Sequence, residues 1–301
     1  MFAAGLISDM ERMDYNGNPV PKINADFHIH SCWSFDSRSD VASIVKKGRD
    51  SGLQYLAITD HCFVIDKDVA NLLDRWEKTS GLQWDGPMVL FGTELSIEVP
   101  VIMKTLAAGL YGFLDVVSGG VHGFPKYQLY VVTDDNGSYE PYIQKFSRII
   151  EAVGLETLAR EYLEITKKAI SLNQLDILVH PWDLFVFAGI IDPLLLEMSE
   201  ELALWAARHN VLIEINNGTF TGVRDSFSNE DYHRTVDFYR NFAGICLLQG
   251  AGFAPGSDAH ILEDVARFSP VIDIFDPTIL TALNSAPEYL LYKKRRNQYV
   301  G

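Results

Sequence analysis

The chain has 301 residues, of which 48% are hydrophobic, and it carries a formal net charge of −15 at pH 7. Its hydrophobic content is sufficient for a large core, which excludes a disordered chain, and its length suits a single barrel domain. The acidic charge argues against duplex nucleic acid or an anionic membrane as a partner, because both favour basic surfaces.

The first residues predict neither a signal peptide nor a membrane anchor. Met1 to Gly5 are mostly apolar, but Asp9, Glu11 and Asp14 follow without a charged leader segment or a long apolar core. No apolar run approaches the roughly 20 residues that a membrane span needs. The three cysteines are an odd number, which suits a reducing compartment better than a disulfide framework. We therefore expect a soluble, cytoplasmic protein.

Short runs rich in β-branched and apolar residues predict seven buried strands. They cover residues 23–30, 55–60, 88–95, 116–122, 176–180, 211–216 and 246–250. Two helices between them are marked clearly: residues 41–50 follow the N-cap candidates Ser39 and Asp40, and residues 193–210 begin at a proline. Apolar strands that alternate with helices are typical of an α/β fold with a parallel sheet covered on both faces.

The stretch 126–174 interrupts this alternation. It begins with the turn-rich residues 134–138, in which Asn136-Gly137 suits a hairpin, and continues with a helical pattern from about 141 to 172. Two interpretations remain open, an insertion that forms a lid or a dimer contact, and an ordinary crossover helix. We expect one domain over residues 1–301, with an insertion at 126–174.

Six of the eight histidines lie in short polar patterns at the ends of predicted strands. The patterns, in order, are Asp26-Phe27-His28-Ile29-His30, Thr59-Asp60-His61, Gly92-Thr93-Glu94, Val121-His122-Gly123, Val179-His180-Pro181 and Gly256-Ser257-Asp258-Ala259-His260. Histidine is the commonest protein ligand for zinc and related ions. One histidine after a strand would more often be an ordinary core or rim residue, but six in order predict a multinuclear metalloenzyme. His209 and His233 lack such a context, and we expect both at the surface.

The position of these patterns also selects the architecture. Residues from distant strands of an open sheet could not meet at one point, whereas the strand ends of a closed barrel form a ring at the C-terminal rim. We therefore expect a (β/α) barrel with a metal site at that rim.

Spacing within the patterns suggests how ions are bound. Residues at i and i+2 of a strand share a face, so His28 and His30 can bind one ion together, and Asp258 and His260 repeat this arrangement. Glu94 supplies a carboxylate that can bridge two cations, and such imidazole and carboxylate sets suit zinc, manganese or iron.

Further residues in or next to these patterns could support the metal site. Asp26 shares the face of His28 and could orient a neighbouring imidazole. Cys32 and Cys62 each adjoin a candidate ligand, and each could be a further ligand or small apolar filler.

The ordered motifs DFHIHSCWSFDS, TDH, GTE, VHG, VHP and GSDAH resemble those of the polymerase and histidinol phosphatase (PHP) superfamily over roughly residues 25–262. The resemblance implies a distorted seven-stranded TIM-like (β/α) barrel that holds three divalent ions. It assigns the first ion to His28, His30, Glu94 and Asp258, and the second to Asp36, His61 and His260. It assigns the third to Glu94, His122 and His180. The family has either Asp or His at the position of Asp36.

The chemistry that the resemblance implies is hydrolysis of a phosphate ester. A hydroxide that bridges two of the cations would attack phosphorus, and Asp258 or a metal-bound water would pass a proton to the leaving group. Arg224 is a candidate for binding the substrate phosphate, because guanidinium groups bind phosphate bidentately. It could equally be a solvated arginine paired with Asp225 or Glu230.

Three functions fit these residues. The first is hydrolysis of a small phosphomonoester, with histidinol phosphate as the natural substrate by resemblance. The second is a phosphodiesterase or exonuclease that acts on nucleotides, which would need stacking aromatic residues along a basic path. Such aromatic residues are present without a neighbouring Lys/Arg run: Trp33, Phe35, Tyr127 and Tyr130. The third is a non-catalytic barrel, which nine ligands for three ions argue against, because closed structural zinc sites use four ligands per ion.

Overall fold

The computed structural model describes residues 21–298 apart from 63–64, 80–81, 100–112, 134–137 and 173. Seven strands of this part pair in chain order, and every pair is parallel. They are β1 (Ala25–Ile29), β2 (Tyr55–Ile58), β4 (Met88–Ser96), β5 (Val116–Gly120), β8 (Ile177–Leu178), β9 (Leu212–Asn216) and β10 (Phe253–Gly256). A short strand, β3 (His61–Cys62), also pairs with β4. The predicted α/β fold with parallel strands is confirmed.

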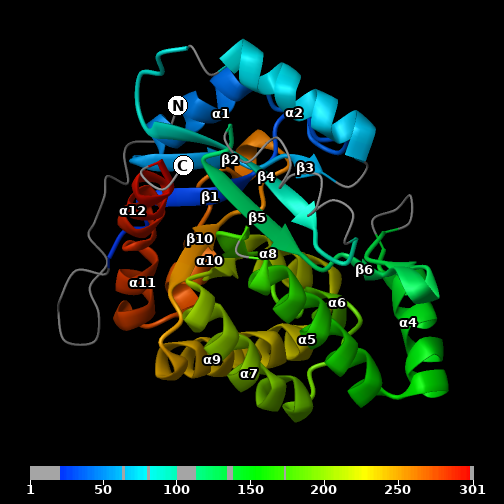
Figure 1. The fold of residues 1–301 in the computed structure, drawn as a ribbon. Helices are drawn as coiled ribbons and strands as arrows, with labels where there is room; N and C mark the ends of the chain where they lie inside the picture. Colours follow the sequence, from blue (N-terminus) through cyan, green and yellow to red (C-terminus); the bar gives the residue numbers. More distant parts are fainter. Residues whose placement is uncertain are drawn as a thin grey trace, which may run out of the picture.

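The first and last strands meet and nearly close the sheet into a barrel. β1 and β10 lie side by side (Figure 1), and Ile29 forms a parallel bridge with Ala259. His30 N donates to Ala259 O at 2.9 Å, and Asp258 N donates to His28 O at 2.9 Å. These closing bonds lie at the strand ends that carry the histidine patterns.

Helices cover the outside of the barrel. α1 (Val41–Asp50) and α2 (Ile65–Thr79) cover one side, and α5 (Leu155–Ser171), α7 (Pro193–His209) and α9 (Asn229–Gln249) form a layer on the other (Figure 1). The other α-helices among the described residues are α4 (Glu140–Val153), α6 (Asp183–Val186), α8 (Asn217–Ser226), α10 (Ser269–Ile274), α11 (Pro277–Leu283) and α12 (Ala286–Gln298). Among the described residues, no helix is both long and apolar enough to cross a membrane.

The two helices predicted with clear ends are confirmed. Asp40 caps α1 by accepting a hydrogen bond from Ser43 N, and Asp192 caps α7 by accepting one from Leu194 N. Pro193 occupies the first turn of α7, where its missing N–H costs nothing.

The interior of the barrel is apolar below the polar rim. One buried cluster takes residues from all seven strands, among them Phe27, Leu90 and Ile177, together with Ala286 and Leu290 of α12. Because every strand contributes, we infer that this cluster fills the barrel and forms the floor beneath the histidine patterns.

The strand predicted at residues 246–250 is wrong. Cys246, Leu247 and Leu248 belong to the last turns of α9, which ends at Gly250 with a left-handed φ of 77°, and the last strand is β10. Buried Phe242, Ala243 and Cys246 continue the helical spacing into this run. A short apolar run has no clear period of its own, so its continuity with the preceding helix decides its structure.

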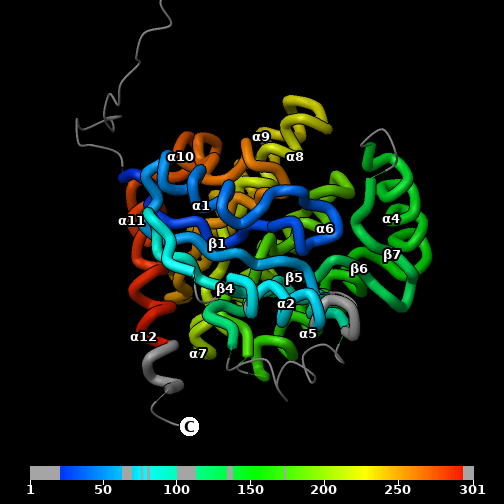
Figure 2. Tube along the Cα trace, turned by 90° about the horizontal axis from the view of Figure 1, so that it is seen from above, coloured from blue at the N-terminus to red at the C-terminus, as the bar shows by residue number. Residues whose placement is uncertain are grey.

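The stretch 126–174 differs in detail from its prediction. The long helical pattern forms two helices, α4 and α5, which are separated by Gly154 at φ 86°. A hairpin is present, but it joins β6 (Gly123–Phe124) to β7 (Leu129–Tyr130), while Asn136 and Gly137 lie outside the described residues. Helix α5 packs on α7 as a crossover helix does, whereas α4 stands at the edge of the molecule next to β7 (Figures 1 and 2).

Candidate metal centre

The structure brings the nine predicted ligands together at the C-terminal rim of the barrel. His28 and His30 come from the end of β1, Asp36 from the loop after it, His61 from β3, Glu94 from β4, and His122, His180, Asp258 and His260 from the segments after β5, β8 and β10. Close contacts between their side chains connect all nine into one cluster.

Glu94 lies at the centre of this cluster. Its side chain is 1% exposed, and its Oε1 lies 2.8 Å from His122 Nε2 and 2.7 Å from His180 Nε2. Its Oε2 lies 2.7 Å from His61 Nδ1, and it also faces His28 Nε2 at 3.4 Å and His30 Nε2 at 3.5 Å. A carboxylate with histidine nitrogens on both oxygens is well placed to bridge cations.

The two aspartates lie next to different pairs of histidines. Asp258 Oδ1 lies 3.5 Å from His28 Nε2 and 3.3 Å from His30 Nε2. Asp36 Oδ2 lies 3.2 Å from His61 Nε2 and 3.3 Å from His260 Nε2. Asp36 therefore joins the same pair of histidines that the resemblance implies.

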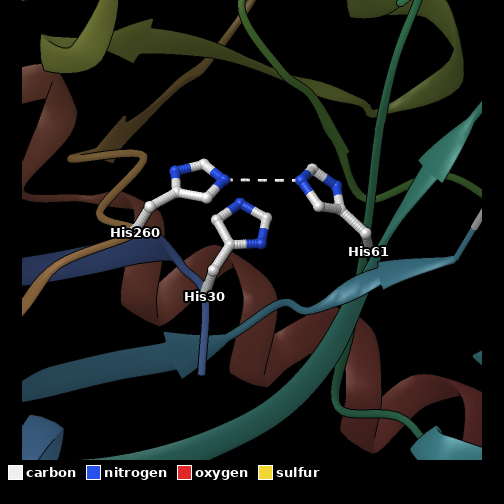
Figure 3. Close-up of side chains that lie close together, drawn as sticks. All are labelled: His30, His61 and His260. Atoms are coloured by element: carbon white, nitrogen blue, oxygen red, sulfur yellow. Dashed lines mark hydrogen bonds between the residues drawn. The ribbon is translucent and has the colours of Figure 1, made fainter. Parts of the chain in front are cut away.

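Figure 3 shows how the rings of His30, His61 and His260 converge. The Nε2 atoms of His61 and His260 lie 3.4 Å apart, and the His30 ring stacks on that of His260 with its centroid 4.1 Å away. Ring nitrogens that face one another at these distances could bind one cation together.

Four overlapping groups of three donors have their ligand atoms within 4.8 Å of one another. They are His30–His61–His260, His28–Glu94–His180, His28–His30–Asp258 and His61–Glu94–His122. These groups differ in part from the three ligand sets that the PHP resemblance implies. In the structure His30 groups with His61 and His260, and His122 groups with His61. No cysteine belongs to these groups among the described residues: Cys32 is exposed and Cys62 is buried.

The residues present fit divalent cations. Among the described residues, His28 Nε2 and His30 Nε2 are buried without a hydrogen-bond partner. Buried polar atoms are rarely left in this way, because their desolvation is costly. Ligand atoms lie about 2.0–2.2 Å from a bound zinc ion, so two ligands of one ion are at most about 4.4 Å apart. Donors within 4.8 Å of one another therefore need only a small movement to share a cation.

Electrostatics within the cluster favour bound positive charge. Burial lowers the pKa of His61, but Glu94 and Asp36 raise it to about 10, and contact with Glu94 likewise raises the pKa of His180 to about 9 against its burial. Burial and two neighbouring histidines lower the pKa of His30 to about 3. A cation can replace the protons of the first two rings and use the free lone pairs of the third.

Two of the nine residues have a strained backbone. His180 has φ 32° and Asp258 has φ 54°, in the left-handed region that residues other than glycine seldom adopt. Such strain costs of order 1–3 kcal/mol per residue, and it gathers at functional sites where the surrounding structure enforces it.

Hydroxyl groups hold two of the histidine rings from behind. Ser34 Oγ donates to Asp60 Oδ1 at 3.0 Å, so it must accept from His30 Nδ1, which lies 3.1 Å away. Ser96 Oγ lies 3.1 Å from His122 Nδ1. These contacts turn the Nε2 atoms toward the cluster, and the motifs in the sequence do not reveal them.

Asp26 does not orient an imidazole, contrary to the prediction. Its carboxylate accepts from the backbone N–H groups of Ser257 and Ala266, each at 3.0 Å, and of His28 at 3.4 Å. Asp26 therefore joins the backbone of β1 to that of the segment after β10, close to the point where the barrel closes.

Arg224 lies in α8, where its Nε donates to Asp225 Oδ1 at 3.1 Å and its side chain is 40% exposed. This is the ion pair predicted as the alternative to phosphate binding.

His209 packs against Trp205, and His233 is exposed, so neither joins the cluster.

Comparison with known proteins shows the family of the chain. Residues 26–218 match the model of the PHP domain family. A probable phosphatase of Shewanella piezotolerans is 24% identical over 277 residues, which cover 90% of this chain and 92% of the relative. A probable phosphatase of Thermoanaerobacter pseudethanolicus is 24% identical over 287 residues, which cover 91% and 97%.

A solved structure shares the fold. The histidinol phosphate phosphatase of Lactococcus lactis, determined with zinc, L-histidinol and phosphate, superposes with a TM-score of 0.53 at 15% identity and covers 89% of this chain and 94% of its own.

Proposed function

The chain belongs to the PHP domain family of phosphatases, and on that premise we propose that it hydrolyses a small phosphomonoester at a cluster of three divalent cations. Histidinol phosphate is the first substrate to test, because a protein of the same fold was determined with L-histidinol and phosphate.

The observation that carries this proposal is the sharing of donors within the cluster. Each of His28, His30, His61 and Glu94 belongs to two of the four donor groups. Shared donors hold neighbouring cations close together, as hydrolysis of phosphate esters at multinuclear centres requires. A structural zinc site needs no such sharing, because four protein ligands close it.

The nine proposed ligands are His28, His30, Asp36, His61, Glu94, His122, His180, Asp258 and His260, a set of imidazoles and carboxylates that suits zinc, manganese or iron. When bound, the cations would supply an activated water and neutralise charge on the transferring phosphoryl group.

The protein itself must supply a proton carrier and orient the phosphate. Asp258 is the proposed proton carrier, because its side chain is 24% exposed at the edge of the cluster whereas Glu94 is enclosed. Burial raises the pKa of Asp258, but His28 and His30 lower it well below its usual range, so the carboxylate is ionised at neutral pH. Arg224 is the proposed phosphate anchor, and it would exchange Asp225 for the substrate.

One observation favours the alternative, a phosphodiesterase or exonuclease that acts on nucleotides. The Phe35 side chain is 74% exposed, and its ring stacks on His61 with the centroids 5.5 Å apart. An exposed aromatic ring beside the cluster could stack on a nucleobase.

Phosphate release by manganese- and zinc-reconstituted protein tests the proposal. The substrates are histidinol phosphate, sugar phosphates, nucleoside monophosphates and a chromogenic diester. The variant His28→Ala removes a ligand, and His233→Ala is the matched control, because it removes an exposed histidine outside the cluster. Monoester turnover that His28→Ala abolishes and His233→Ala retains supports the proposal. Turnover of the diester alone favours the alternative, and no turnover of any substrate contradicts both.

A further inference from the structure

Glu214 is a buried carboxylate that the proposed mechanism does not use. It lies in the middle of β9 between Ile213 and Ile215, and it is 2% exposed. A carboxylate in such surroundings is costly unless hydrogen bonds satisfy both oxygens. The hydrogen-bond partners of Glu214 therefore indicate why a carboxylate is present in this strand.

Both oxygens of Glu214 contact proposed ligands or their neighbours. Oε1 lies 2.8 Å from His28 Nδ1. Oε2 accepts from His180 N at 2.7 Å and from Asn216 Nδ2 at 3.2 Å. Asn216 Nδ2 also lies 3.3 Å from Asp258 Oδ2. Glu214 thus contacts two of the nine residues directly and a third, Asp258, through Asn216.

The contact with His28 selects the tautomer of that ring. A carboxylate oxygen only accepts hydrogen bonds, so His28 Nδ1 must carry the hydrogen. In the neutral ring the lone pair is then on Nε2, the buried atom that faces Glu94 Oε2 at 3.4 Å and Asp258 Oδ1 at 3.5 Å. The bond to His180 N similarly holds the backbone of a second ligand at its strained φ of 32°.

The neighbouring strand leaves room for this contact. Gly256 of β10 pairs with Asn216 of β9, and a Cβ at Gly256 would overlap the Glu214 carboxylate and crowd the His28 side chain. The glycine that opens the GSDAH motif therefore permits the close approach of Glu214 to His28.

We propose that Glu214 is a positioning residue that fixes the tautomer of His28 and the backbone of His180, so that both present Nε2 to the cations. This rests on the proposed cation cluster, and it adds a residue that the nine ligands do not include. Outer carboxylates of this kind typically change metal affinity by about 10- to 100-fold.

The full-length variant Glu214→Gln tests this role. The glutamine oxygen must accept from His180 N and Asn216, which turns its NH₂ group toward His28 Nδ1. That ring then favours the hydrogen on Nε2, where it competes with the cation. We expect calorimetry on metal-stripped protein to show about 10- to 100-fold weaker binding of Mn²⁺ or Zn²⁺. Glu98→Gln is the matched control, because the buried carboxylate of Glu98 accepts from the backbone N of His122 and, among the described residues, bonds no histidine ring. It should change affinity by a few-fold at most.

A measurement on the zinc-loaded wild-type protein does not depend on how the variant folds. ¹⁵N NMR of histidine side chains, with His28→Gln used to assign the signal, should show the hydrogen of His28 on Nδ1. Zinc binding that is equal in wild type and Glu214→Gln, or a His28 hydrogen on Nε2, would overturn the proposal for Glu214 and leave the proposed function standing. A wild-type protein that binds no cation would instead refute the proposed function itself.

Discussion

Residues behind the cluster decide where the histidine nitrogens point. Ser34 is held by Asp60, and Asp60 also accepts from Ser31 and pairs with the buried guanidinium of Arg75. Because the Ser34 hydrogen is used by Asp60, His30 Nδ1 must donate, and its Nε2 lone pair faces the cluster. The proposed role of Glu214, which lies on β9, gives His28 the same arrangement.

Sequence spacing predicts the residues that face the cluster but not those that support them. His28 and His30 are recognisable because a strand puts i and i+2 on one face. Glu214 is 186 positions from His28, and no local pattern records that contact. A charged residue inside the apolar run 211–216 is the one signal that could have revealed it. Asp26 shows that spacing can also mislead. Its i, i+2 relation to His28 predicts a hydrogen bond to a histidine ring, but its carboxylate accepts from backbone N–H groups instead.

Replacing Arg224 by Ala tests the phosphate anchor. A bidentate bond to a charged group contributes about 1.5–3 kcal/mol, so KM for the monoester should rise about tenfold or more while kcat changes little. Steady-state kinetics measures this. Asp225→Ala, which removes the partner of Arg224, should leave KM unchanged or lower it. An unchanged KM in Arg224→Ala would show that other groups bind the phosphate.

At the scale of elements, caps explain why some boundaries were predictable. α1 and α7 begin after aspartates whose side chains accept from the first turn, and both signals are local. The end of α9 is hard to predict, because Cys246 to Leu248 taken alone suits a helix or a strand equally, and only its continuity with the preceding helical spacing decides its structure. In residues 126–174, helical periodicity likewise predicts helices but does not show which of them packs against the barrel.

Replacing Asp40 by Ala tests the cap of α1. The loss of the hydrogen bonds to Ser43 should lower the free energy of unfolding by about 1 kcal/mol, measured by urea denaturation at neutral pH. Asp40→Asn keeps an acceptor and should lose much less.

The effect of Asp40→Ala should also depend on pH. Hydrogen bonds from Ser43 lower the pKa of Asp40 below its ordinary value, so the stabilisation is present above the unfolded-state pKa of about 4 and disappears as the pH falls through the lower, folded-state value. A difference between wild type and Asp40→Ala that stays constant down to strongly acidic pH would contradict this account of the cap.

At the scale of the whole molecule, the barrel and its site depend on each other. The proposed ligands come from the ends of strands across the whole sheet, and two of them, His28 and Asp258, lie where β1 meets the segment after β10. The motif order predicted this closure, because only a closed ring of strand ends brings such distant residues together. Cations bound here would join the first strand to the last.

Removing the cations should therefore lower the melting temperature. Ligand at about 100 times its dissociation constant stabilises a protein by about 2.7 kcal/mol. With an unfolding entropy of about 2.1 cal/mol/K per residue, that corresponds to roughly 4 °C in a chain of 301 residues. Scanning calorimetry with and without a chelator measures the shift, and His28→Ala should show a smaller one. Identical melting curves for wild type would mean that the folded protein binds no cation preferentially.

The most direct test of the central claim, a cation-dependent phosphomonoesterase, is phosphate release by metal-free protein during stepwise addition of Mn²⁺, with bound metal measured at each step. The substrate is the best monoester of the panel. We predict no release without metal, a rise that continues beyond one Mn²⁺ per chain, and no recovery in His28→Ala. Release by chelated protein that contains no measurable metal, or full activity of His28→Ala, would contradict the claim.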